Sequence, residues 1–241
     1  MAFEEAGFCV VRGPDLLWGG DIKKFHPPSG RFDGVIGGPP CKAFSSLAPI
    51  VRQRYGPQAV KANLIPEFER CIAECQPRWF VMENVRRAPL PQIEGYAISA
   101  LLLNARHVGS EQMRVRRFSF GIRGAKPISL LPFVECVALE PFKVEPTVLG
   151  GHAGSGTGLK FSGTPNSVGK LYKKSESAIA RMNLVAKRTL DDCVRLQGLP
   201  PDFLNGSPLT LAGKRDVVGQ GVPLPMGRAI ANAVRQALQK M

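Results

Sequence analysis

The chain of 241 residues contains none of the sequence features that mark a membrane, secreted or zinc-binding protein. It has no apolar run of about 18 residues, the length that a membrane-spanning helix requires. The first residues lack the basic and then apolar segments of a signal peptide, so we expect a cytoplasmic protein with reduced thiols. The six cysteines show neither CxxC spacing nor clustering with histidine, so we expect no metal site. A GxxxxGK[ST] phosphate loop is also missing.

Acidic residues are scarce relative to basic ones. Lys and Arg number 32 against 19 Asp and Glu, which gives a formal net charge of +13. Such a charge favours a polyanionic partner through electrostatic steering and counterion release. A merely basic surface would give the same composition, so charge alone does not identify the partner.

Strand-like and helix-like patterns alternate along the first half of the chain. This order predicts the α/β fold class, with a mostly parallel sheet. Between 124 and 187 we find no periodicity, and the many glycines there are typical of a flexible surface loop. Another loop is expected over 42–62. The predicted strands cover 8–11, 33–38, 79–82 and 116–122, and the predicted helices cover 2–8, 65–75, 96–105 (with Leu101, Leu102 and Leu103 facing the core) and 225–238.

A cysteine follows the second predicted strand on a stiff turn, Gly37-Gly38-Pro39-Pro40-Cys41. Proline fixes φ and removes a backbone donor, so the two prolines make a rigid mount for the thiol. Glu83 follows the next strand, and ligands of parallel sheets bind beyond the carboxyl ends of strands. An apolar margin would raise the pKa of Glu83 and suit it to donate a hydrogen bond. The alternative for Cys41 is a buried structural cysteine.

Three polar side chains, Gln112, Arg114 and Arg116, alternate along the stretch that leads into the last predicted strand. Alternation places them on one face, with Val115 and Arg117 on the other. This face is either a solvated edge or part of a site.

Five segments resemble the motifs of the DNA (cytosine-5) methyltransferases, in the order of that family. They correspond to its GGPPCQxFS, ENV, QxRxRxF, RLQGFP and GNxVP motifs. In this chain they are residues 37–45, 83–85, 112–118, 195–200 and 219–223.

The resemblance implies a Rossmann-like, S-adenosylmethionine-dependent methyltransferase acting on duplex DNA. Cys41 would attack C6 of a flipped cytosine, Glu83 would bind N3 and the exocyclic amine, and Arg116 would hold the O2 edge. Arg114 would support the loop or a phosphate. Cofactor contacts are expected from Asp15, Asp21, Ile22, Pro39, Gln220 and Val222, and nucleic-acid contacts from Phe44, Ser45, Asn84, Gln112, Lys173, Lys174 and Gln197.

The chain also departs from the family pattern. The first strand and the FxGxGG loop are not found, and residues 1–8 resemble the helix that follows that loop. Lys42 replaces the usual glutamine beside the nucleophile, where it could lower the pKa of Cys41, and Gln220 replaces an asparagine. We expect an N-terminally incomplete catalytic domain at 1–124, a reduced target-recognition region at 125–187, and a completing segment at 188–241. We further expect a monomer in a bacterial or phage-infected cell.

Three other functions are compatible with these patterns. The missing FxGxGG loop favours a catalytically impaired relative that binds DNA without the cofactor. The same chemistry could act on RNA cytosine. A basic structural DNA-binding protein without catalysis is the third alternative, in which Cys41 would only pack.

Overall fold

The computed structural model describes residues 1–14, 20–40, 44, 53, 56, 63–124, 126–137, 145, 147–148 and 188–241. These residues form two compact units. The first, here called the sheet unit, comprises Met1–Leu103, Val115–Glu135 and Ile230–Met241. The second unit comprises Asn104–Arg114 and Cys136–Ala229.

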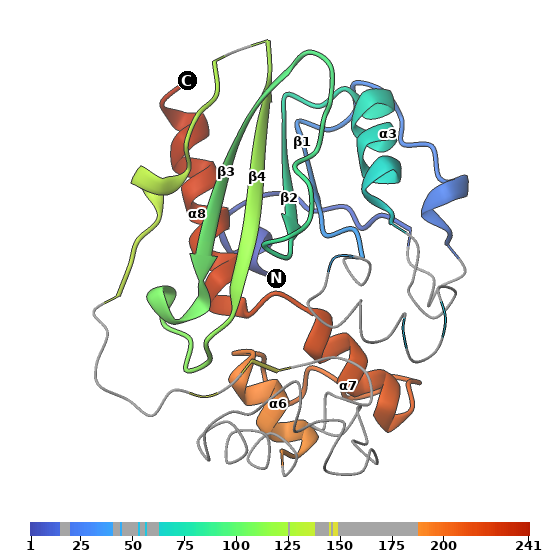
Figure 1. Cartoon of the computed structure of the whole chain (residues 1–241), viewed down its shortest axis with the longest axis vertical. Coiled ribbons are helices and arrows are strands. Elements are labelled where there is room, and N and C mark those ends of the chain that lie inside the picture. Colours follow the sequence, from blue (N-terminus) through green and yellow to red (C-terminus); the bar gives the residue numbers. More distant parts are fainter. Residues whose placement is uncertain are drawn as a thin grey trace. The chain divides into compact units, whose positions relative to one another are not determined.

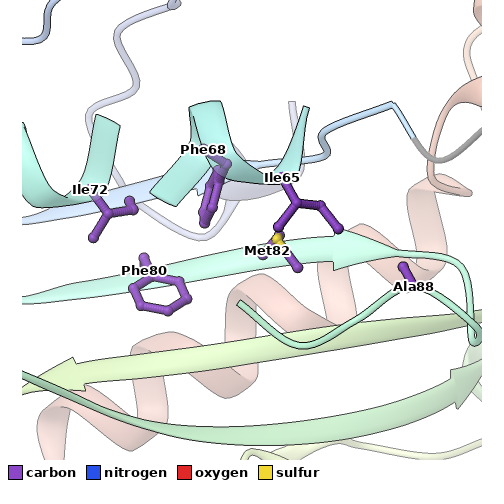
Figure 2. Close-up of a cluster of buried hydrophobic side chains, with 6 residues drawn as sticks. All are labelled: Ile65, Phe68, Ile72, Phe80, Met82 and Ala88. Carbon is purple, nitrogen blue, oxygen red and sulfur yellow. The ribbon is translucent and has the colours of Figure 1, made fainter. Parts of the chain in front are cut away.

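A four-stranded sheet organises the sheet unit, in the order β1-β2-β4-β3. β1 and β2 are parallel, whereas β2 and β4 are antiparallel. β3 also runs against β4, so that β4 alone opposes the direction of the other strands (Figure 2). The α/β class is confirmed. The strands are β1 (Gly34–Gly37), β2 (Trp79–Asn84), β3 (Tyr96–Asn104) and β4 (Val115–Arg123).

Helix α3 (Ile65–Cys75) covers one face of this sheet (Figure 1). Pro66 stands in its first turn, where a missing backbone donor costs nothing. Phe68 and Ile72 of the helix pack on Phe80 and Met82 of β2, as Figure 2 shows. Burial of these apolar side chains is the main force that holds the helix to the sheet.

The other face of the sheet carries aromatic side chains and the end of the last helix. Trp79 lies against the rings of Phe3 and Phe8, with centroid distances of 6.4 and 5.5 Å. Ile230 and Val234, in the part of α8 that belongs to the sheet unit, are buried. The remaining elements of the sheet unit are α1 (Ala2–Glu5), η2 (Ile22–Lys24) and η6 (Leu131–Phe133).

The second unit has its own apolar cluster, which includes Val148, Val194 and Val218. Thr189 caps α6 by accepting a hydrogen bond from the Asp192 amide at 3.1 Å, an interaction that stabilises helix starts. Its elements are η5 (Ala105–Val108), α6 (Leu190–Leu196), α7 (Leu211–Gln220) and the beginning of α8 (Leu224–Gln239).

Two predicted elements are wrong. Residues 96–105 form strand β3 instead of a helix: Leu101 and Leu103 are buried, but Leu102 is 48% exposed. Pairing with β4 overrides the helix propensity of this Ala- and Leu-rich run. Residues 8–11 form no strand, since Val11 is exposed and Phe8 packs its ring on Trp79.

The other element predictions are confirmed within a few residues at each end. Most of the loop predicted at 42–62, and most of 138–187, lies outside the described residues. Among the helices that are described, none is long and apolar enough to cross a membrane.

Candidate active site

Glu83 and Arg116 form an ion pair in the sheet unit. Their Oε1 and Nε atoms are 2.8 Å apart, and the side chains are 18% and 16% exposed. Glu83 is the residue before last in β2, and its partner across the β2–β4 ladder is Phe118. Arg116 is therefore its diagonal neighbour on the same face, which is close enough for a long side chain to reach. Nη1 of Arg116 also donates to the Val115 carbonyl at 2.9 Å.

The turn after β1 lies close to this pair. A Cβ atom on Gly38 would be 3.2 Å from Oε2 of Glu83, a separation tighter than ordinary van der Waals contact. Glycine at this position therefore makes room for the carboxylate. The side chain of Asn84 joins the same turn to β2, because its Nδ2 donates to the Pro39 carbonyl at 3.3 Å and its Oδ1 accepts from the Val85 amide at 2.9 Å.

Part of the predicted site lies outside the described residues. This is the case for Cys41 and Ser45 of the proline turn, for Asp15, and for Lys173 and Lys174. Phe44 is described, and it is half-buried against the apolar cluster of α3 and β2. A side chain packed in this way anchors its segment to the sheet.

Gln112, Arg114 and Gln197 are buried together in the second unit, away from solvent. Arg114 donates to the carbonyl oxygens of Val148 at 2.7 Å, Gly219 at 2.9 Å and Gly221 at 3.0 Å. It also reaches the Gln220 carbonyl at 3.4 Å. These contacts hold the turn after α7 against the segment at Val148.

The two glutamines extend the same network. Gln112 donates to the Leu196 carbonyl at 2.6 Å and to Oε1 of Gln197 at 2.9 Å, and it accepts from the Val148 amide at 3.0 Å. Gln197 donates to the carbonyls of Val218 at 2.5 Å and Gly221 at 3.2 Å. Buried polar groups are stable only when hydrogen-bonded, and here most of them bond backbone groups. Three of the five sequence motifs thus meet in one buried network.

The comparisons with known proteins agree with this geometry. The family model for C-5 cytosine-specific DNA methylase matches residues 19–149, which is more than half of the chain. The chain belongs to this family. The matched residues include β1, β2 and β4, and with them the Glu83–Arg116 ion pair.

Two curated relatives illustrate the similarity. The type II methyltransferase M.HgiDI of Herpetosiphon aurantiacus is 36% identical over 42% of this chain and 33% of its own length. M.HindV of Haemophilus influenzae is 23% identical over 88% of this chain and 76% of its own length. The match to the first relative thus spans about a third of that protein. Among solved structures, the DNMT2 of Spodoptera frugiperda has a TM-score of 0.48 at 12% identity, covering 86% of this chain and 79% of that one.

The described cofactor candidates of this chain have unequal surroundings. Oδ1 of Asp21 accepts from the Lys23 amide at 3.0 Å, and Ile22 beside it is half-buried. Within the described residues the second carboxylate oxygen has no partner. A carboxylate oxygen can accept a hydrogen bond from the exocyclic amine of a purine. An apolar side chain beside it can cover the purine ring. In the second unit, Gln220 is exposed and donates to Oδ2 of Asp216, whereas Val222 is half-buried.

Sequence reasoning missed one residue that orders the Asp21 segment. Arg70 of α3 donates to the carbonyls of Ile22 at 2.7 Å and Phe25 at 3.0 Å, and it pairs with Glu67 and Glu74 of its own helix. Glutamates three residues before and four residues after an arginine are a recognisable helix pattern. The carbonyl contacts leave no such signal in the sequence.

Proposed function

We propose that this chain transfers a methyl group to C5 of cytosine in duplex DNA. The observation that carries the proposal is the Glu83–Arg116 pair at 2.8 Å, set at the end of β2 with Gly38 making room for the carboxylate. A carboxylate and a guanidinium side by side match the polar edge of cytosine. Glu83 offers acceptors to the exocyclic amine, and the arginine offers donors to O2.

The roles of these two residues follow from their geometry. Glu83 would accept from the exocyclic amine and, when protonated, donate to N3 of a base that has left the duplex, since these atoms are paired in stacked DNA. Arg116 holds Glu83 in position and, through its Nη2 donors, would bind O2. Both side chains are fixed by neighbouring strands, so little conformational entropy is lost when the base binds.

Cys41 would act as the nucleophile at C6. Its thiolate would form a bond to C6 as the electron pair of the C5–C6 double bond moves toward C4 and N3. Glu83 would enter this step as the neutral carboxylic acid and give its proton to N3, while Arg116 would donate to O2. S-adenosylmethionine supplies an electrophilic methyl group when bound. C5 would form its bond to that methyl group and then lose its proton to water. The Cys41 thiolate would leave C6 and N3 would return its proton to Glu83, which restores the aromatic ring. Asn84 donates to the Pro39 carbonyl, and this hydrogen bond ties the proline segment that precedes Cys41 to β2.

Asp21, Ile22 and Pro39 fit the adenosine end of the methyl donor. One carboxylate oxygen of Asp21 caps η2, and the other is available for an amine. For Asp15, Gln220 and Val222, contact with the donor stays a prediction from the sequence.

We assign Arg114, Gln112 and Gln197 a positioning role. Their side chains already bond to one another and to backbone groups of the second unit. Phe44 and Asn84 have the same kind of role beside the proline turn. Among the residues predicted from sequence to contact nucleic acid, we propose direct DNA contacts for Ser45, Lys173 and Lys174.

The test is covalent trapping on duplex DNA in which 5-fluorocytosine replaces cytosine, with the methyl donor present. Fluorine cannot leave as a proton does, so the enzyme should remain attached to the DNA. We expect a denaturation-resistant adduct with the native protein and none with Cys41→Ala, although that variant should still bind DNA. The proposal fails if the folded protein binds both donor and DNA but forms no adduct. A stronger adduct with fluorinated RNA would instead favour the RNA enzyme.

A further inference from the structure

A tight turn that carries two arginines follows the catalytic strand β2. The Ala88 amide donates to the Val85 carbonyl at 3.0 Å, which closes a four-residue turn. Arg86 and Arg87 occupy its two central positions, and both are exposed. In the part of the chain that the structure describes, neither arginine has an acidic partner.

The two ends of this turn are fixed to the sheet unit. Ala88 is 1% exposed and belongs to the cluster that α3 forms with Phe80 and Met82, as Figure 2 shows. At the other end, the Val85 amide donates to Oδ1 of Asn84 at 2.9 Å. Burial on one side and a hydrogen bond on the other leave the turn little freedom.

Arg117 adds a third restraint from the neighbouring strand. It pairs with Asn84 in the β2–β4 ladder, and its Nη2 donates to the carbonyls of both Arg86 and Ala88. A charged donor gives stronger hydrogen bonds to carbonyl oxygens than a neutral one does. Arg117 therefore holds the backbone of the turn, while the side chains of Arg86 and Arg87 are exposed to solvent.

We propose that Arg86 and Arg87 form a binding site for DNA backbone phosphates next to the flipped cytosine. Arg86 follows Glu83 by three positions, so the turn stands at the rim of the proposed base site. Guanidinium groups bind phosphate oxygens in bidentate fashion, and a preordered turn loses little entropy on binding. The site would hold the strand whose base has left the stack. This inference rests on the proposed function.

The test compares two double variants that remove the same charge from opposite ends of one ladder. Arg86→Gln/Arg87→Gln neutralises the turn. Arg78→Gln/Arg123→Gln neutralises two exposed arginines at the far end of β2 and β4, where the Arg123 amide donates to the Arg78 carbonyl. Duplex DNA affinity is measured at several salt concentrations, and thermal melting checks that both variants are folded.

We expect the turn variant to bind more weakly and to lower the slope of log K against log[salt] by about 2, roughly one for each phosphate that the protein no longer neutralises. The control should leave the slope close to that of the native protein. Equal reductions of slope in the two variants would overturn the proposal, because net charge alone would then explain them. So would a reduced slope on duplex RNA but not on DNA.

Trapping on 5-fluorocytosine DNA separates this inference from the proposed function. If the native protein forms the adduct and the turn variant matches the control in affinity and slope, only the phosphate site is wrong. If the native protein neither binds DNA nor forms the adduct, the proposed function is wrong as well.

Discussion

Arg114 and Arg116 are two residues apart, but they belong to different units and have opposite surroundings. Arg114 is 1% exposed, and its guanidinium bonds backbone carbonyls of the second unit. Arg116 lies in the sheet unit beside the carboxylate of Glu83. One motif therefore contains two kinds of arginine. The first holds backbone segments of the second unit together, and the second pairs with the carboxylate that we propose for catalysis.

The difference extends to the rest of the two regions. In the second unit, motif side chains such as Gln112 and Gln197 bond to one another and to backbone groups. In the sheet unit, Glu83 near the end of β2 pairs with the side chain of Arg116 on the neighbouring strand. The motif residues together indicate the family, but the chemistry of each residue depends on the groups that surround it.

The largest expected effect is on catalysis at Glu83. Glu83→Gln keeps the size of the side chain but removes the acidic proton that we propose Glu83 gives to N3. We expect the methyl-transfer rate to fall by about 10²–10⁴, with little change in thermal stability. Single-turnover transfer of labelled methyl groups measures this.

Glu94→Gln is the matched control, because Glu94 is exposed in the segment before β3. It should keep the native rate. If Glu83→Gln were as active as this control, the sheet unit would contain no catalytic carboxylate at Glu83, and the contrast with Arg114 would lose its basis.

The second effect is on stability at Arg114. Arg114→Met leaves the carbonyls of Val148, Gly219 and Gly221 without their donor. Each buried carbonyl that loses its partner costs about 1–3 kcal/mol, so we expect a loss of roughly 3 kcal/mol or more. Urea denaturation followed by circular dichroism measures it.

Arg195→Met is the control within the same unit, because Arg195 pairs with Glu111 at 57% exposure of both side chains. Exposed ion pairs contribute about 0–1 kcal/mol. If the two variants lost the same stability, Arg114 would not be the organising residue of the second unit.

Much of this comparison could not be predicted from sequence. Helix 65–75 could be, because its apolar residues recur at helical spacing after Pro66. Strand β3 could not, since its Ala and Leu residues favour helix and only pairing with β4 makes them extended. The alternation of Gln112, Arg114 and Arg116 was visible. The burial of the first two was not, because their main partners include backbone carbonyls far along the chain, which have no sequence signature.

Two glycine substitutions sharpen the contrast between site and scaffold. At Gly38, a Cβ atom would press on Oε2 of Glu83 at 3.2 Å. Gly38→Ala should therefore displace the carboxylate by a few tenths of an ångström. A misplacement of this kind can reduce the rate by up to about 10²-fold, and the fold should be unchanged.

Gly121→Ala is the structural counterpart in β4. Its Cβ would lie 2.1 Å from the Phe80 ring, and overpacking of this kind costs about 1–3 kcal/mol. Melting temperature and transfer rate are measured for both variants. A stability loss at Gly38 equal to that at Gly121 would show that the proline turn is scaffold.

The smallest expected effect concerns the partner of Arg70, another arginine that bonds backbone carbonyl oxygens. Unlike Arg114, it is partly exposed, with 27% of its side chain accessible. Hydrogen bonds from Arg70, and then from His26, hold the pKa of Glu74 below its usual value. A carboxyl group with a lowered pKa stabilises the fold above its unfolded-state pKa, and this contribution is lost as the pH falls through the lowered value.

Glu74→Gln should therefore melt slightly below the native protein at neutral pH, and the difference should vanish in acid, below the usual carboxyl range. Melting curves across pH measure it, with Glu69→Gln as a control on the same helix. A difference that persists in acid would mean that Glu74 acts through packing and not through its charge. The contrast with Arg114 is then one of burial: both arginines hold backbone carbonyls, but water weakens the contribution of the exposed one.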